Sequence, residues 1–140
     1  RMTLIVVNQA EEAMLDLVLA VNYTLRLYKT DVTLGLTQAQ KDALTESSFV
    51  EATFTGYAGA ALTGGSWTTT PGNPATGSYA MQTFTSSADQ TPQAVYGYYI
   101  TRTSGGALQW FEPFPGPVIF EFNGEYYEVT PRLTLADTGD

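Results

Sequence analysis

Apolar residues follow a helical period in one long stretch near the N-terminus. Between residues 9 and 21 they recur three or four positions apart, and the acidic side chains fall on the other side. The apolar set is Ala10, Ala13, Met14, Leu17, Val18 and Val21, and the acidic set is Glu11, Glu12 and Asp16. Asn8 precedes the stretch and Glu11 follows three residues later, which is the spacing of an N-terminal capping box. The pattern predicts an amphipathic helix from about residue 9 to residue 21.

A second, shorter helix is predicted from Thr37 to about Leu44, because Thr37 and Gln40 repeat the capping-box spacing. Elsewhere the pattern is that of strands. From residue 22 the period changes to two, with Tyr23, Leu25 and Leu27 on one face. Further strands are expected over residues 49–55, 79–85, 94–103, 107–112 and 132–135, with an Asn123-Gly124 hairpin over residues 120–127. Residues 63–78 are predicted to be a long loop, or to contain an irregular strand near Trp67.

These elements predict a mainly β fold, a single antiparallel β-sandwich or barrel-like domain spanning residues 1–140. About eight strands, one N-terminal helix and a short second helical turn fit the spacing of the turn signals. Residues 136–140 are expected to form a polar tail, and residues 1–8 are a candidate N-terminal arm.

The composition narrows the chemistry. The chain carries 14 acidic and 6 basic residues, a net charge of −8, so a nucleic-acid partner is not expected. Cysteine and histidine are both absent, which excludes disulfides, zinc sites of the usual kind and nucleophile–histidine catalysis. The apolar runs are too short to span a membrane. We therefore expect no cofactor and no metal, and a binding role rather than an enzymatic one.

Two features suggest a partner surface. Residues 4–7 are four apolar residues in a row, Leu4, Ile5, Val6 and Val7, so they form either a central buried strand or an arm that pairs with another chain. Tyr98-Tyr99 and Trp110-Phe111 are adjacent aromatic pairs, and adjacent strand residues point to opposite faces. One member of each pair therefore points away from the core unless that face is also covered. The candidate interface residues are Leu4, Ile5, Val6, Val7, Trp67, Tyr98, Trp110, Phe111 and Phe114.

Carboxylates are the remaining candidates for catalysis, since a glycosidase needs only two of them and no histidine. Glu112, Glu121, Glu125 and Glu128 lie in the C-terminal half, where the simpler interpretation is that they occupy solvated strand faces. The aspartates lack the spacing of a calcium loop.

Several blocks of the chain, in their order, resemble small virion proteins of tailed bacteriophages. They are Met2 to Asn8 followed by the acidic helix, "TLRLYKTDVT" (24–33), "TESSFVEATFTGYAGAAL" (45–62), "VYGYYIT" (95–101) and "VTPRLTL" (129–135). Val7 departs from the pattern, which would have proline there, and residues 113–117 are richer in proline than expected.

The resemblance implies a non-enzymatic structural protein of the virion, a capsid cement (decoration) protein. Such a protein would bind the major capsid protein on the outer surface of the phage head and self-associate as a dimer or trimer. Two alternatives stay open at this point. One is a phage tail or head-completion protein. The other is a host glycan-binding module that stacks sugars on Trp67, Tyr98 or Trp110.

Overall fold

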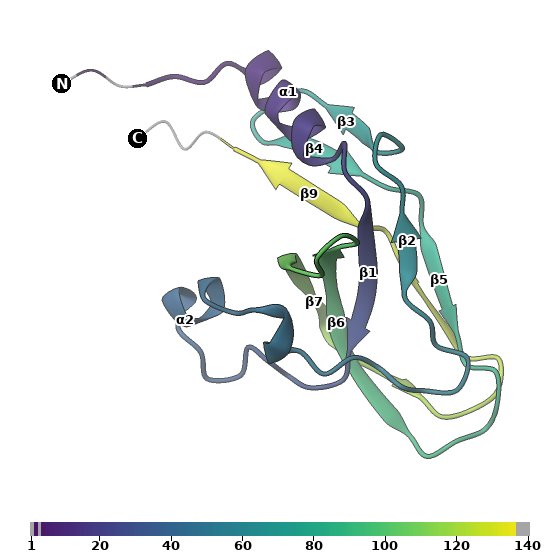
Figure 1. Cartoon of the computed structure of the whole chain (residues 1–140). Helices are drawn as coiled ribbons and strands as arrows, with labels where there is room; N and C mark the ends of the chain where they lie inside the picture. Colours follow the sequence, from purple (N-terminus) through teal and green to yellow (C-terminus); the bar gives the residue numbers. More distant parts are fainter. Residues whose placement is uncertain (1, 3, 137–140) are drawn as a thin grey trace. The chain divides into compact units, whose positions relative to one another are not determined.

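The computed structural model describes residue 2 and residues 4–136. Within these residues the fold is mainly β, with antiparallel sheets, one long N-terminal helix and a short second helix, as the sequence predicts. The elements are α1 (Asn8–Val18), β1 (Tyr23–Tyr28), α2 (Gln38–Asp42), a 3-10 turn (Glu46–Ser48), β2 (Ala60–Leu62), β3 (Thr68–Thr70), β4 (Ala75–Ser78), β5 (Gln82–Thr85), β6 (Gln93–Arg102), β7 (Leu108–Phe120), β8 (Tyr126–Val129) and β9 (Arg132–Leu135). They are labelled in Figure 1 where space allows.

The chain divides into two compact units and passes between them more than once. The first unit holds residues 1–22, 62–82 and 129–140, and the second holds residues 23–61 and 83–128. Each is described separately below.

In the first unit α1 packs on a three-stranded antiparallel sheet of order β3-β4-β9 (Figure 1). Ala75 and Gly77 are the buried positions of the central strand β4. A Cβ atom on Gly77 would lie 2.5 Å from Leu19 Cδ1, so the side chains of the helical segment can approach the strand this closely only at a glycine. The Thr69 hydroxyl on β3 donates a hydrogen bond to Asp16 Oδ1 (2.6 Å), which ties the helix to the sheet.

The start and the buried face of α1 differ from the prediction. Helical geometry begins at Asn8 itself, the N-cap is Val7, and no side chain caps the helix there. Glu11, Leu15 and Leu19, four residues apart, are the buried positions. Met14, Leu17 and Val18, which the prediction placed on the apolar face, are exposed instead. A three-stranded sheet with strands of three or four residues covers one narrow face of the helix, and Leu15 and Leu19 occupy it.

The second unit is built on a four-stranded sheet of order β2-β1-β6-β7. β6 pairs antiparallel with β1 and with β7, which confirms the predicted hairpin around residues 104–106. Val95 pairs with Val118, and Gly97 pairs with Pro113. The register therefore shifts at Tyr96, which lies opposite a four-residue bulge in β7, residues 114–117. Prolines 113, 115 and 117 carry no N–H group, and they lie in the strand at the sheet edge, where that loss is tolerated.

Two strand predictions need correction, and the structure decides between two alternatives for a third stretch. Residues 49–55 form no strand, only a bridge between Tyr28 and Glu51. The predicted loop at 63–78 contains β3 and β4, which agrees with the alternative of a strand near Trp67. Residues 120–127 turn at Gly124 (φ +90°), but β7 and β8 do not form a ladder, because β8 pairs with β5. A turn signal fixes the local reversal of the chain but not the strand with which the chain next pairs.

Both adjacent aromatics of β6 are buried. Tyr99 stacks on Phe49 (ring centroids 4.7 Å apart), which also contacts Tyr28 and Phe111. On the opposite face of the strand, Tyr98 is 2% exposed and its hydroxyl donates to Glu112 Oε1 (3.1 Å). The sheet face that carries Tyr99 is thus covered within the unit by the segment that contains Phe49.

A polar network attaches that covering segment to β1. Arg26 Nη1 donates to Glu51 Oε2 (2.8 Å), and the Tyr57 hydroxyl donates to the same oxygen (3.1 Å). The Leu27 N–H donates in turn to the Tyr57 hydroxyl oxygen (3.1 Å). Burial, together with Glu51, raises the pKa of Tyr57 far above its ordinary value, so this tyrosine stays protonated and able to donate.

Candidate functional site

Residues 4–7 lie outside every helix and strand, ahead of α1. The exposed fractions are 78% for Leu4, 74% for Ile5 and 61% for Val7, while Val6 is half-buried. This excludes the central buried strand, one of the two interpretations that the sequence left open. The other, an arm that pairs with a second chain, stays a prediction.

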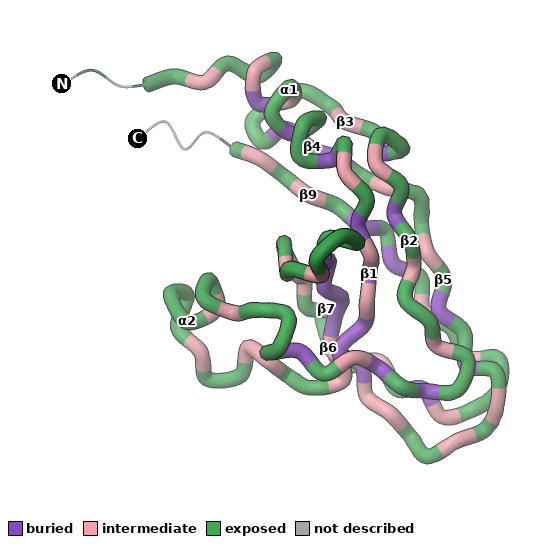
Figure 2. The backbone as a smooth tube through the Cα atoms, viewed as in Figure 1, coloured by how far each residue is buried: buried purple, intermediate pink, exposed green. Residues whose placement is uncertain are grey.

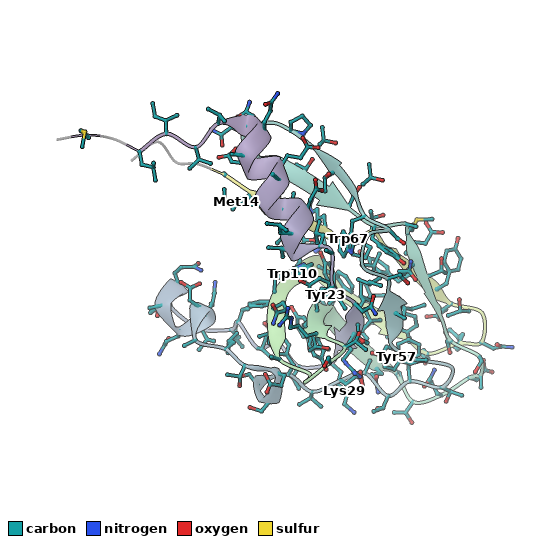
Figure 3. All side chains as sticks on the ribbon, turned by 45° about the horizontal axis from the view of Figure 1, so that its top comes forward. Met14, Tyr23, Lys29, Tyr57, Trp67 and Trp110 are labelled. Atoms are coloured by element: carbon teal, nitrogen blue, oxygen red, sulfur yellow. The ribbon has the colours of Figure 1, made fainter. Side chains whose placement is uncertain are left out.

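The outer face of α1 continues this exposed apolar character along the chain. Met14, Leu17 and Val18 are all exposed, Leu17 by 75%. Leu4, Ile5, Val7, Met14, Leu17 and Val18 are called the N-terminal apolar surface below. Figure 2 shows that the tube over this segment is mainly green, with buried positions only at the face of α1 toward the sheet. Met14 is labelled in Figure 3.

A second candidate lies in the other unit, at the free edge of its four-stranded sheet. A cavity of about 570 Å³ separates β7 from the segment that contains α2, called the edge pocket below. Its lining residues come from two stretches of the chain: Thr33, Gln38, Lys41, Asp42 and Leu44, and then Leu108, Gln109, Trp110, Phe111 and Pro113. Its size falls in the range of roughly 300–1,000 Å³ that is typical of small-molecule sites.

Local structure positions both walls of the edge pocket. On one wall Thr37 is the N-cap of α2, and the predicted capping box with Gln40 is present. Gln38 Nε2 donates to Asp42 Oδ1 (2.8 Å), one helical turn on, which orients both side chains. On the other wall Trp110 packs edge-on against Tyr23, at a centroid distance of 5.2 Å (Figure 3). The two walls are joined near the base, where Glu46 Oε2 accepts a hydrogen bond from the Leu108 N–H (3.3 Å).

The structure brings together only some of the predicted interface residues. Trp110 and Phe111 are half-buried and both line the edge pocket. Phe114 is also half-buried and packs on Tyr127 (4.6 Å). Trp67 is buried against Tyr79 in the first unit, and Tyr98 is a core residue of the second. Neither of these last two offers a ring face to a ligand.

The candidate acidic residues do not gather in the edge pocket. Glu125 accepts hydrogen bonds from the backbone N–H groups of Glu121 and Phe122, so it holds the turn at residues 121–125. Glu112 accepts from Tyr98, and Glu128 is exposed on β8. Among the residues that the structure describes, no group of three or more acidic side chains is placed to hold a metal ion. In the same part of the chain no helix is long and apolar enough to cross a membrane.

Two features were missed by the sequence reasoning. Gln38, Lys41 and Asp42 give the edge pocket its polar wall, but they lie more than sixty residues from β7 and share no motif with it. Glu11 is 1% exposed, and neither carboxylate oxygen has a hydrogen-bond partner within the described structure. In the sequence Glu11 looked like a capping residue on the polar side of the helix, and it lies on the buried side.

Comparison with known proteins provides no relative to set beside these two candidate sites. No protein-family model matches the chain, and no curated protein and no solved structure matches it.

Proposed function

We propose that this chain is a non-enzymatic structural protein of a bacteriophage particle, a decoration protein that binds the outer surface of the major capsid protein and stabilises the head. The observation that carries the proposal is the N-terminal apolar surface. Six large apolar side chains within one short stretch of chain, residues 4–18, are exposed. The choice of the major capsid protein as the proposed partner rests on the sequence resemblance to small virion proteins of tailed phages.

Exposed apolar side chains are common singly but uncommon in groups, and a group of them marks a contact surface. The helical part has the spacing of a docking helix, because Met14, Leu17 and Val18 lie at positions i, i+3 and i+4. The apolar part ahead of it, Leu4 to Val7, can extend the contact. A capsid partner would therefore offer a groove for α1 and an apolar channel or strand edge for the arm.

The remaining properties fit an assembly role. A net charge of −8 keeps free subunits apart in solution before they meet the capsid. Capsid symmetry would bring copies together around a local axis as dimers or trimers, with the partner site repeated once per capsid subunit.

The test is cosedimentation with purified expanded heads that lack the protein. Leu17→Glu should abolish binding, because it places a charge within the docking face of α1. Leu34→Glu is the matched control, since Leu34 is 80% exposed in the second unit and is not part of the N-terminal apolar surface. Equal binding of both variants would contradict the proposal. Binding to purified tails but not to heads would favour the tail or head-completion alternative.

A further inference from the structure

We propose that the edge pocket is a binding site for a neutral carbohydrate, with a pyranose ring held between β7 and α2. This goes beyond attachment to the capsid, because the edge pocket and the N-terminal apolar surface belong to different units and share no residue.

One wall of the edge pocket is mainly apolar and the other is mainly polar. Leu44, Leu108 and the two aromatics Trp110 and Phe111 supply apolar area. The C–H faces of a pyranose ring pack on such side chains, and half-buried aromatics supply large contact area at small entropic cost. A purely apolar ligand is disfavoured, because it would cover the amide and carboxylate groups of the other wall without satisfying them.

The lining of the edge pocket has no net formal charge. It contains one cation, Lys41, and one anion, Asp42, at neighbouring positions of the chain. The two cancel, so the pocket favours neither a phosphate nor a polycation by its net charge. Within the described residues the side-chain ammonium group of Lys41 forms no ion pair or hydrogen bond, so it is available as a donor. An uncharged ligand with many hydroxyl groups satisfies such a lining best.

Several polar side chains of the edge pocket are held in place by hydrogen bonds within the protein. The Gln38–Asp42 hydrogen bond orients an amide and a carboxylate across one turn of α2, leaving Gln38 Oε1 and Asp42 Oδ2 as acceptors. Gln109 Nε2 donates to the carbonyl oxygens of Ala107 and Leu108 (3.2 Å each), which holds its amide along the strand edge. Planar amide and carboxylate groups can each contact two adjacent sugar hydroxyls, and their orientation is set before the ligand arrives.

The experiment uses the full chain and a panel of simple neutral sugars: methyl glucoside, methyl galactoside, methyl mannoside and N-acetylglucosamine. Saturation-transfer NMR detects binding, and amide shifts map it. At least one sugar should bind and shift the amides of residues 38–42 and 108–111. Gln109→Ala and Asp42→Ala should each weaken that binding about tenfold, the cost of one or two hydrogen bonds.

Gln82→Ala is the matched control, because Gln82 Nε2 makes the same bond to the carbonyl two residues back, that of Ala80 (2.8 Å). It should leave sugar binding unchanged. The proposal is overturned if no sugar binds, if the shifts fall outside the pocket, or if Gln82→Ala weakens binding as much as Gln109→Ala. Shifts in the pocket with an apolar peptide and with no sugar would also overturn it. Head binding is measured separately, so failure here leaves the decoration proposal standing.

Discussion

Strand β6 and helix α1 are both apolar over much of their length, yet they are buried in opposite ways. β6 is covered on both faces, so Tyr98 and Tyr99 are 2% and 5% exposed although they point in opposite directions. α1 is covered on one face only, by three short strands, and its second apolar face remains at the surface. Apolar residues that look alike in sequence are therefore buried in one element and exposed in the other, and the amount of sheet available to cover them decides which.

The largest expected effect is the difference between Tyr99→Ala and Leu17→Ala in the free energy of unfolding. Removing the Tyr99 ring leaves a cavity beside Phe49, and we expect a loss of about 3–5 kcal/mol in the free energy of unfolding. Leu17 is 75% exposed, so its truncation should change that free energy by no more than about 0.5 kcal/mol. Urea denaturation of both variants measures the difference. A large loss in Leu17→Ala would mean that this face of α1 belongs to the core.

The covered side of α1 is tested by Gly77→Ala. The new Cβ would press on Leu19 Cδ1 at 2.5 Å, so the buried Leu19 side chain or the helix that carries it must shift, and we expect a loss of about 1–3 kcal/mol. Gly116→Ala is the control, because a Cβ there meets nothing within 4 Å. Thermal melting of the two variants should show a lower Tm for Gly77→Ala alone. A similar Tm for both would argue against close packing of α1 on β4.

Replacing Glu11 should stabilise the protein, which is unusual for a buried position. Its carboxylate is buried without a hydrogen-bond partner, so Glu11→Met removes an uncompensated polar group and retains the packing volume. We expect a gain of about 1–3 kcal/mol in the free energy of unfolding. Glu128→Met, at an exposed position, serves as the control and should change stability little. A loss of stability in Glu11→Met would show that the carboxylate has a partner in solution.

The smallest expected effect is a change in stability at alkaline pH, and it concerns the face of β6 on which Tyr99 packs with Tyr28 and Phe49. Burial raises the pKa values of Tyr28 and Tyr99 above the ordinary tyrosine value of about 10. Above about pH 10 the folded state therefore holds more protons than the unfolded state, so stability is fully present below that pH and falls as the pH rises. Tyr28→Phe should flatten this fall in denaturation series from about pH 8 to 11. Tyr126→Phe, at a 62% exposed ring, should not, and an equal flattening would contradict the assignment.

Most local signals in the sequence predicted local structure well, except for the capping box expected at Asn8 and Glu11, which does not form. The capping box of α2, the alternation of β1 and the turn between β6 and β7 are each encoded within a few residues, and each is confirmed. Predictions that depended on distant partners failed. The Asn123-Gly124 turn is present, but β8 pairs with β5, and residues 49–55 form only the bridge between Glu51 and Tyr28.

The candidate sites show the same division. Four consecutive apolar residues indicated either a buried strand or an arm at residues 4–7, and their exposure excludes the strand. The exposure of Leu17 was not predicted. The sequence pattern placed Leu17 on the predicted core face of α1. In the structure Leu15 and Glu11 are buried instead, because their side of the helix packs on β3, β4 and β9. The edge pocket forms only where the segment of α2 lies beside β7, and this proximity could not be predicted from the sequence. Of its lining residues, only Trp110 and Phe111 were predicted to be functional, as an adjacent aromatic pair.

We propose that the N-terminal apolar surface attaches this chain to a phage head. Cryo-electron microscopy of purified virions, with the copy number of the chain measured by quantitative gel, tests this attachment. We predict a copy at every equivalent site of the icosahedral lattice, with Leu17 and residues 4–7 buried against the major capsid protein. A few copies confined to the tail, or lattice copies in which α1 faces solvent, would contradict the account.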